Sequence, residues 1–229
     1  MALLTCENAS FAYEGKAAAK NINFSVESGD YLCIVGENGA GKSTLMKGLL
    51  RLKSPTSGSI CLGEGLQTNE IGYLPQQTEV QKDFPASVYE VVLSGCLNRL
   101  KGRPFYGRAE KELAAEKLEQ LGITALKHRA YRELSGGQQQ RALCATQKIL
   151  LLDEPAAGLD PLVTNELYEL IAKVNRELGL TIIMVSHDIN SVMQYASKVL
   201  HLDTEQLFFG TVEDQPHRGA FLGRAFPWW

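Results

Sequence analysis

The chain has 229 residues, of which 45% are hydrophobic and 21% are charged, with a formal net charge of −3 at pH 7. These proportions are typical of a globular protein with one large or two small domains and a substantial core. The slightly acidic balance excludes a general attraction to nucleic acid or to anionic membrane surfaces.

The sequence predicts neither a secretory signal nor a membrane span. No charged segment followed by an apolar one opens the chain, and the longest aliphatic runs, such as 149–152 and 182–185, are too short to cross a bilayer. The cysteines are scattered without a C-x-x-C pair, at Cys6, Cys33, Cys61, Cys96 and Cys144. We therefore expect reduced, mostly buried thiols in a cytosolic protein.

Two strands are predicted first, over residues 2–13 and 21–27, around a loose turn at residues 14–16. Tyr13 ends the first strand, and its aromatic face could stack on a nucleobase. A core position for this ring fits the pattern equally well.

The strongest motif follows a predicted buried strand over 31–35. Residues 36–43 read G-E-N-G-A-G-K-S and lead into a helix over 44–50, which is the context that a phosphate-binding loop requires. The glycines let backbone N–H groups point into one concavity, to which the helix N-terminus adds positive dipole. We expect Lys42 to reach the β- and γ-phosphates and Ser43 to ligate Mg²⁺. A glycine-rich turn without a ligand is the structural alternative.

Two short strands are predicted next, over 59–62 and 71–74, after a turn at residues 54–58. The second strand ends at Pro75, because proline cannot donate to the ladder. Gln76 is thereby presented on a loop.

A helical region is predicted between residues 77 and 148, where the sequence carries little strand signal. Residues 87–90 (S-V-Y-E) and 135–138 (S-G-G-Q) each form a capping box at a helix start. A charged amphipathic helix over 108–121 ends at Gly122.

The last part alternates strand and helix. An apolar strand over 149–152 fits a parallel strand covered on both faces, and it delivers Asp153 and Glu154 at its C-terminal end, where α/β proteins place their chemistry. Asp160 and the following proline begin a helix that runs to Gly179.

A further buried strand over 181–185 carries His187 just beyond its end, and residues 198–202 and 206–210 predict a closing hairpin.

The carboxylates after residue 152 predict chemistry at the phosphate loop. A charged Asp153 at the end of a buried apolar strand costs free energy unless its carboxylate binds a cation, such as Mg²⁺ held together with Ser43. Glu154 faces differently and can polarise a water toward the γ-phosphate, a general-base effect of roughly 10²–10⁴-fold. A role in capping the next loop is the alternative.

Residues 134–138 (L-S-G-G-Q) resemble the signature motif of ATP-binding-cassette (ABC) ATPases, in the expected order between the phosphate loop and L-D-E-P at 152–155. The resemblance extends to about residue 210. It implies an α/β fold: a P-loop NTPase (RecA-like) core with a mostly parallel sheet, an N-terminal antiparallel β subdomain and an inserted α-helical subdomain. We expect a single ABC ATPase domain over 1–229, divided into a nucleotide-binding core (1–76 and 149–215), a helical subdomain (77–148) and an irregular tail (216–229).

The resemblance also assigns roles to residues of this sequence. Tyr13 matches the adenine-stacking aromatic residue, Gln76 the Q-loop glutamine, residues 157–160 the D-loop and His187 the switch histidine. The catalytic residues are expected to be Glu154, His187, Gln76 and Lys42. The metal ligands are expected to be Ser43, Gln76 and Asp153. The ATP-binding residues are expected to be Tyr13, Gly36, Glu37, Asn38, Gly39, Ala40, Gly41, Lys42, Ser43, Thr44, Ser135, Gly136, Gly137, Gln138 and Asp160. For His187 and Gln76 the structural alternatives are a satisfied buried histidine and an ordinary loop glutamine.

The signature motif is a second anion-binding helix start in one chain. In the family it closes on the ATP of a partner molecule, so a head-to-tail homodimer is expected on ATP binding. One departure concerns this motif: between Gln138 and residue 149 the chain is about five residues shorter than the usual family pattern, or about 7.5 Å of helix. Either the helix is rebuilt, or residues are missing from the sequence, or the motif is misaimed.

The family implies an ATPase that powers a transporter. Residues 83–92 resemble the segment after the Q-loop in zinc and manganese importers, although iron–siderophore and cobalamin importers are similar there, and Phe84 and Val88 could simply pack the helical subdomain. The expected partners are a separate integral membrane permease and an extracytoplasmic substrate-binding protein, with no nucleic acid. The expected location is peripheral, on the cytoplasmic face of the membrane, with a chain that is soluble when isolated.

Two other functions remain open. A soluble, non-transport ABC ATPase, for example in cofactor assembly, carries the same motifs. A P-loop kinase or GTPase does not need residues 135–138. The basic stretch 99–108 is interpreted as a solvated loop, with contact to permease loops, lipid headgroups or nucleic acid as alternatives.

Overall fold

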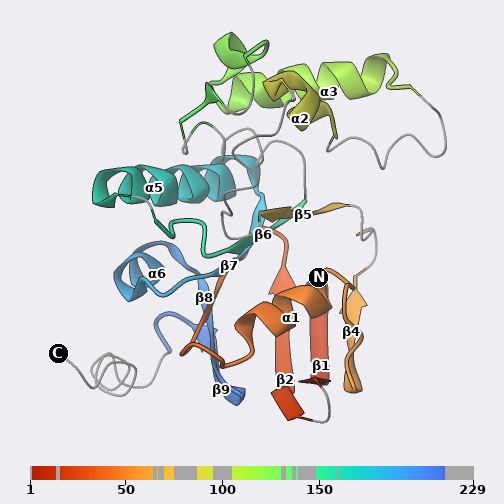
Figure 1. Ribbon diagram of the computed structural model, residues 1–229, viewed down its shortest axis with the longest axis vertical. Coiled ribbons are helices and arrows are strands. Elements are labelled where there is room, and N and C mark those ends of the chain that lie inside the picture. Colours follow the sequence, from red (N-terminus) through yellow and green to blue (C-terminus); the bar gives the residue numbers. More distant parts are fainter. Residues whose placement is uncertain are drawn as a thin grey trace.

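A single mixed sheet runs through the protein, in the order β4-β1-β2-β9-β8-β3-β7-β6-β5 (Figure 1). The computed structural model describes residues 2–13, 16–63, 66, 70–74, 87–94, 105–129, 133–135, 138, 148–158 and 160–214. The strands are β1 (Ala2–Tyr13), β2 (Lys16–Glu27), β3 (Tyr31–Val35), β4 (Ser57–Leu62), β5 (Ile71–Leu74), β6 (Ile149–Asp153), β7 (Thr181–Val185), β8 (Lys198–Asp203) and β9 (Glu205–Thr211). The helices are α1 (Lys42–Leu49), α2 (Val88–Ser94), α3 (Arg108–Gln120), the 3₁₀ turn η4 (Thr124–Leu126), α5 (Pro161–Leu178) and α6 (Ile189–Tyr195).

The parallel part of the sheet holds the candidate site. β5, β6, β7, β3 and β8 pair in parallel. Every residue of β3 and β7 is buried, as expected for strands that are covered on both faces. Because the strands are parallel, their C-terminal ends meet at one edge of the sheet.

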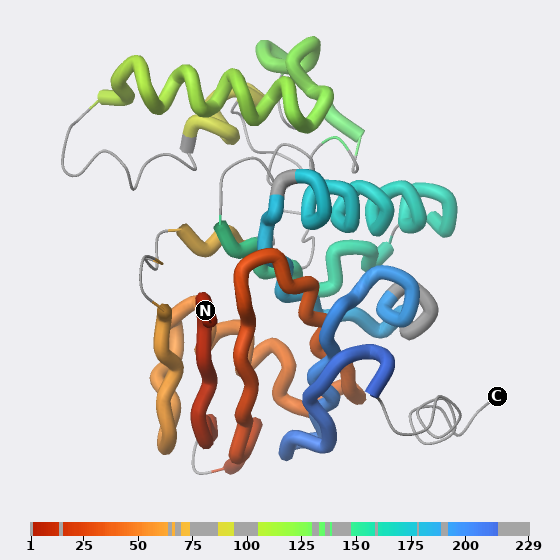
Figure 2. Tube along the Cα trace, turned by 180° about the vertical axis from the view of Figure 1, so that it is seen from behind, coloured from red at the N-terminus to blue at the C-terminus, as the bar shows by residue number. Residues whose placement is uncertain are grey.

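The two faces of this part carry different helices. Alternate residues such as Leu32 and Ile34 of β3 pack with α1, whereas Cys33 and Val35 pack in the other cluster, with α5 and the helices between β5 and β6. Figures 1 and 2 show α2 and α3 beyond α5, away from the antiparallel strands. The mostly parallel core and the antiparallel N-terminal strands agree with the predicted fold class.

The N-terminal strands β1, β2 and β4 are antiparallel to one another. The predicted start of the second strand at residue 21 is wrong, because β2 begins at Lys16, opposite Tyr13. The run Ala17–Ala19 has little strand preference of its own, and pairing with β1 overrides it. β4 likewise begins at Ser57, two residues before its predicted start, because Ser57 pairs with Ser10.

The antiparallel strands join the parallel part at one seam. Lys20 of β2 pairs with Glu205 of β9, and its N–H donates to the Thr204 carbonyl at 2.7 Å. The side chains of Lys20 and Glu205 also form an ion pair at 3.6 Å, although both are exposed and contribute little energy. The backbone pairing at this seam is therefore narrow, and a hydrogen bond from the Asn23 N–H to Gln206 Oε1 and the ring contact between Phe24 and Phe209 add to it.

Several predicted helix ends are confirmed. At the start of α2, the Ser87 N–H donates to Glu90 Oε2 at 2.8 Å and the Glu90 N–H donates to Ser87 Oγ at 3.3 Å. Gly122 follows α3 with a left-handed φ of 65°. In the described part of the chain, no helix is both long enough and apolar enough to span a membrane.

The thiols only partly follow the prediction. Cys6 and Cys33 are buried, but Cys61 is exposed because it lies on the face of β4 opposite to its neighbours Ile60 and Leu62, which pack against the core. Cys96 and Cys144 lie outside the described residues, as do residues 83–86, 95–104, 139–147 and the tail from 215.

Candidate functional site

The phosphate loop connects β3 to α1 by a backbone that only glycine accommodates well. Gly41, the N-cap of α1, has a φ of 93°. A Cβ atom at this position would lie 2.2 Å from the Ala18 carbonyl oxygen. Residues 37–39 and Ser43 are exposed, so the rim of the loop is open to a ligand.

Lys42 lies inside this loop and is only 5% exposed. Its Nζ donates to the carbonyl oxygens of Gly36 and Glu37, both at 2.8 Å. Burial lowers the pKa of Lys42, and the charges of Glu154 and Asp153 oppose that shift. The predicted phosphate ligand is therefore within electrostatic reach of both predicted carboxylates.

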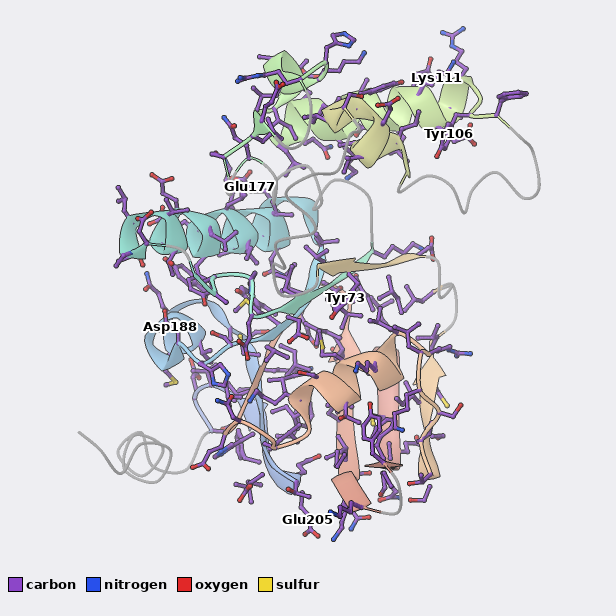
Figure 3. All side chains as sticks on the ribbon, viewed as in Figure 1. Tyr73, Tyr106, Lys111, Glu177, Asp188 and Glu205 are labelled. Atoms are coloured by element: carbon purple, nitrogen blue, oxygen red, sulfur yellow. The ribbon has the colours of Figure 1, made fainter. Side chains whose placement is uncertain are left out.

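Asp153 is the last residue of β6. Burial raises the pKa of its carboxyl, and the neighbouring charge of Glu154 raises it further. The Tyr73 hydroxyl, from the adjacent strand β5 (Figure 3), donates to Asp153 Oδ2 at 3.4 Å. Asp153 and Ser43 both offer the hard oxygen donors that Mg²⁺ prefers. A cation here would relieve the cost of the half-buried carboxylate, so these residues fit a magnesium ion.

Glu154 and His187 are brought together from the ends of β6 and β7. The His187 Nε2 lies 2.7 Å from Glu154 Oε1. Glu154 adopts a left-handed φ of 49°, and its N–H donates to the Val185 carbonyl at 3.1 Å, which turns the side chain away from the line of the strand. The side chain of His187 is 38% exposed, so the alternative of a buried structural histidine is wrong.

Tyr13 ends β1 and is 45% exposed, so the alternative of a core aromatic residue is also wrong. The Nζ of Lys53 lies 3.7 Å from the centre of the ring, a cation–π distance. An exposed ring can receive a base, but stacking on adenine stays a prediction.

Three further predicted site residues, Asp160, Ser135 and Gln138, form caps at helix starts. Asp160 caps α5, its Oδ1 accepting from the N–H groups of Leu162 and Val163 at 3.1 Å each. Ser135 N–H donates to Gln138 Oε1 at 3.1 Å, and Gln138 N–H donates to Ser135 Oγ at 3.4 Å. The second capping box is thus confirmed. Gln76, Gly136 and Gly137 lie outside the described residues.

Sequence reasoning missed two neighbours of the site, Tyr73 and Lys53. Tyr73 reaches Asp153 because β5 pairs with β6 in a register that sets Tyr73 opposite Leu151. The register between two strands that lie so far apart in the chain cannot be predicted from a local sequence pattern. Its only sequence signal is an aromatic residue three positions before Gln76.

Comparison with known proteins decides the family. The sequence profile of the family described as ABC transporter matches residues 19–157. The chain belongs to the ABC transporter family. It is accordingly an ATP-binding ATPase whose hydrolysis is coupled to transport, which excludes the kinase and GTPase alternatives.

Relatives within the ABC family include metal-transport proteins. The zinc uptake system ATP-binding protein ZurA of Listeria innocua is 35% identical, with 94% of this chain and 88% of the relative covered. The manganese transport system ATP-binding protein MntB of Listeria monocytogenes is 38% identical, with 88% and 87% covered.

Solved ABC structures confirm the fold. An inward-facing putative metal-chelate type ABC transporter gives a TM-score of 0.85 at 29% identity and covers 99% of this chain and 89% of that one. The dimeric bacterial ABC transporter cassette MJ0796 gives a TM-score of 0.69 at 27% identity, with 91% and 98% covered.

Proposed function

We propose that this ABC ATPase powers the import of a metal ion or metal chelate through a separate membrane permease. The support is the run of relatives named for zinc uptake, manganese transport and, in Yersinia pestis, chelated iron transport, the last at 33% identity. A substrate-binding protein outside the membrane would deliver the metal. The chain would sit peripherally on the cytoplasmic face, bound to the permease.

ATP would bind with its phosphates in the loop before α1. The exposed rim at residues 37–39 and the amides at the helix start supply the cradle. Lys42 would exchange its carbonyl partners Gly36 and Glu37 for phosphate oxygens, and the exposed ring of Tyr13 would take the adenine. Ser43 and Asp153, with the predicted Gln76, would hold Mg²⁺. When bound, this ion neutralises charge on the phosphates.

The contact between Glu154 and His187 supports the hydrolysis step of the proposal. A carboxylate that lies 2.7 Å from an imidazole, next to the loop lysine, would accept a proton from an attacking water. His187 would fix the orientation of Glu154 and bind charge that develops near the γ-phosphate.

Hydrolysis would take place between two copies of the chain. Ser135 and Gln138 form a capping box, the pattern of a helix start that can bind an anion, and it would serve a phosphate of another copy. A head-to-tail dimer would bring it to the ATP of the partner, and the solved dimer of MJ0796 supports this arrangement. We also propose the division into a core (1–76 and 149–215) and a helical subdomain (77–148), supported by the described helices α2 and α3 between β5 and β6.

Glu154→Gln tests the catalytic assignment. The variant keeps the size of the side chain but removes the base, so we expect ATP binding to persist, turnover to vanish and an ATP-bound dimer to accumulate. Steady-state phosphate release, nucleotide binding and size-exclusion chromatography measure these three. Glu166→Gln, an exposed position on α5, is the matched control and should hydrolyse at the parent rate.

Parent-rate hydrolysis by Glu154→Gln would remove Glu154 from its role. If the parent chain bound ATP but neither hydrolysed it nor dimerised, we would infer that the shortened segment after residue 138 directs the signature motif away from the ATP of the partner. Co-purification with an integral membrane protein tests the proposed permease partner.

A further inference from the structure

The turn that carries His187 is built on a buried hydroxyl, that of Ser186. Ser186 is 3% exposed, and its Oγ accepts a hydrogen bond from the Asp188 N–H at 3.0 Å. Its own N–H donates to the Ile34 carbonyl of β3 at 3.2 Å. His187 therefore lies at the middle of a short turn that is fixed on both sides.

A second buried hydroxyl reaches the same oxygen from α5. The Oη of Tyr168 lies 3.2 Å from Ser186 Oγ, and Tyr168 is 2% exposed. Its ring stacks on Tyr195 of α6, with centroids 6.5 Å apart and planes at 27°. Burial raises the pKa of Tyr168 above its ordinary 10.0, so the phenol stays protonated at neutral pH and can donate.

Tyr168 therefore links the turn to the helix that follows Glu154. α5 starts at the Asp160 cap, downstream of Glu154 in the same segment of chain. A cavity of about 220 Å³ lies between these elements, and Glu154, Tyr168, Ser186 and His187 all contribute to its lining. The hydrogen bond between Tyr168 and Ser186 is thus a direct contact between α5 and the turn that carries His187.

We propose that Tyr168 is a positioning residue for ATP hydrolysis, which acts through Ser186 to hold His187 at hydrogen-bond distance from Glu154. The proposal rests on the proposed function, because it gives the Glu154–His187 contact a catalytic purpose. Without the phenol oxygen, Ser186 keeps its backbone partners but loses its link to α5. The turn can then shift relative to Glu154, although the fold is retained.

Tyr168→Phe removes one oxygen and keeps the stacked ring. We expect kcat for ATP hydrolysis to fall about five- to tenfold, the scale of one lost hydrogen bond, with KM for ATP unchanged. In protein labelled with ¹⁵N-histidine, the ring signals of His187, assigned with a His187→Gln variant, should shift. Tyr195→Phe removes the hydroxyl from the other ring of the pair and should change neither measurement.

Ser186→Ala should reproduce both effects, and adding Tyr168→Phe to it should change little more, because Ser186→Ala already removes the link to Tyr168 together with the acceptor of the Asp188 N–H. Unchanged His187 signals in Tyr168→Phe would overturn the positioning role. Shifted signals with unchanged kcat would overturn its importance for hydrolysis, as would an equal loss in Tyr195→Phe. A failure of the proposed function appears separately, as continued turnover by Glu154→Gln.

Discussion

Lys42 already has two partners within its own loop, the carbonyl oxygens of Gly36 and Glu37. These bonds hold the ammonium at the centre of the loop at the expense of its hydration. A buried cation next to two carboxylates is poised to exchange weak neutral acceptors for charged ones. The residue thus keeps the loop shaped before phosphate arrives.

Lys42→Ala should therefore abolish the tight binding of ATP. Charge-assisted hydrogen bonds are worth about 1.5–3 kcal/mol each, so losing two predicts a fall of at least about 100-fold in affinity. Isothermal titration calorimetry measures this directly. Lys173→Ala, at a 61% exposed lysine on α5, is the control, and an affinity in Lys42→Ala equal to that control would contradict the phosphate-loop assignment.

Residues within short motifs could be predicted from the sequence, and residues joined by packing could not. Lys42, Asp153 and Glu154 lie in motifs whose spacing alone indicates their chemistry. Tyr73 and Tyr168 reach the same site through strand register and helix packing, which no local pattern encodes. For Tyr13, the sequence left two interpretations open, and the 45% exposure of the residue decided against the core.

The phosphate loop as an element depends on two different kinds of glycine. Gly39 has a φ of 87° with open space around its missing side chain. Gly41 has a φ of 93° and also packs against the Ala18 carbonyl of β2. Gly39 is needed only for its backbone conformation, whereas Gly41 also allows the phosphate loop to approach the backbone of β2.

Gly39→Ala and Gly41→Ala separate these two requirements. Gly39→Ala should cost about 1–2 kcal/mol of stability for the left-handed backbone and should still bind ATP. Gly41→Ala adds a backbone collision, so we expect a greater loss of stability and no measurable ATP binding. Urea unfolding and nucleotide titration test both; equal behaviour of the two variants would show that the contact with Ala18 is unimportant.

Strands could be predicted from the sequence where their own residues form a continuous apolar run. β3, β6 and β7 are short apolar runs bounded by turn residues, and their positions follow directly from the sequence. The first half of β2 is an alanine run that becomes a strand only because β1 lies beside it. The start of β4 has the same origin, in its pairing with Ser10.

At the scale of the whole molecule, the burial of each cysteine side chain shows which parts of the sheet are closed to solvent. Cys33 lies in the central strand β3 and is fully buried, whereas Cys61 is exposed on the edge strand β4. Burial raises the pKa of Cys6 to about 12 and that of Cys33 further still. Only the thiolate reacts readily with alkylating reagents.

Iodoacetamide at pH 8 should therefore modify Cys61 and spare Cys6 and Cys33 until the protein unfolds. Peptide mass spectrometry over a urea series measures the three sites separately. Labelling of Cys33 should follow global unfolding, because β3 lies between helices on both faces. Labelling of Cys33 as fast as Cys61 in native buffer would contradict the packing described for this strand.

The narrow seam between β2 and β9 has a consequence for the life of the protein in the cell. Tyr13 belongs to the antiparallel strands, and the phosphate loop belongs to the parallel ones, so an ATP bound as proposed would bridge the two. A ligand at a hundred times its dissociation constant adds about 2.7 kcal/mol to the stability of the folded state. When ATP runs short, that contribution is lost, and with it a link between the antiparallel strands and the parallel part of the sheet.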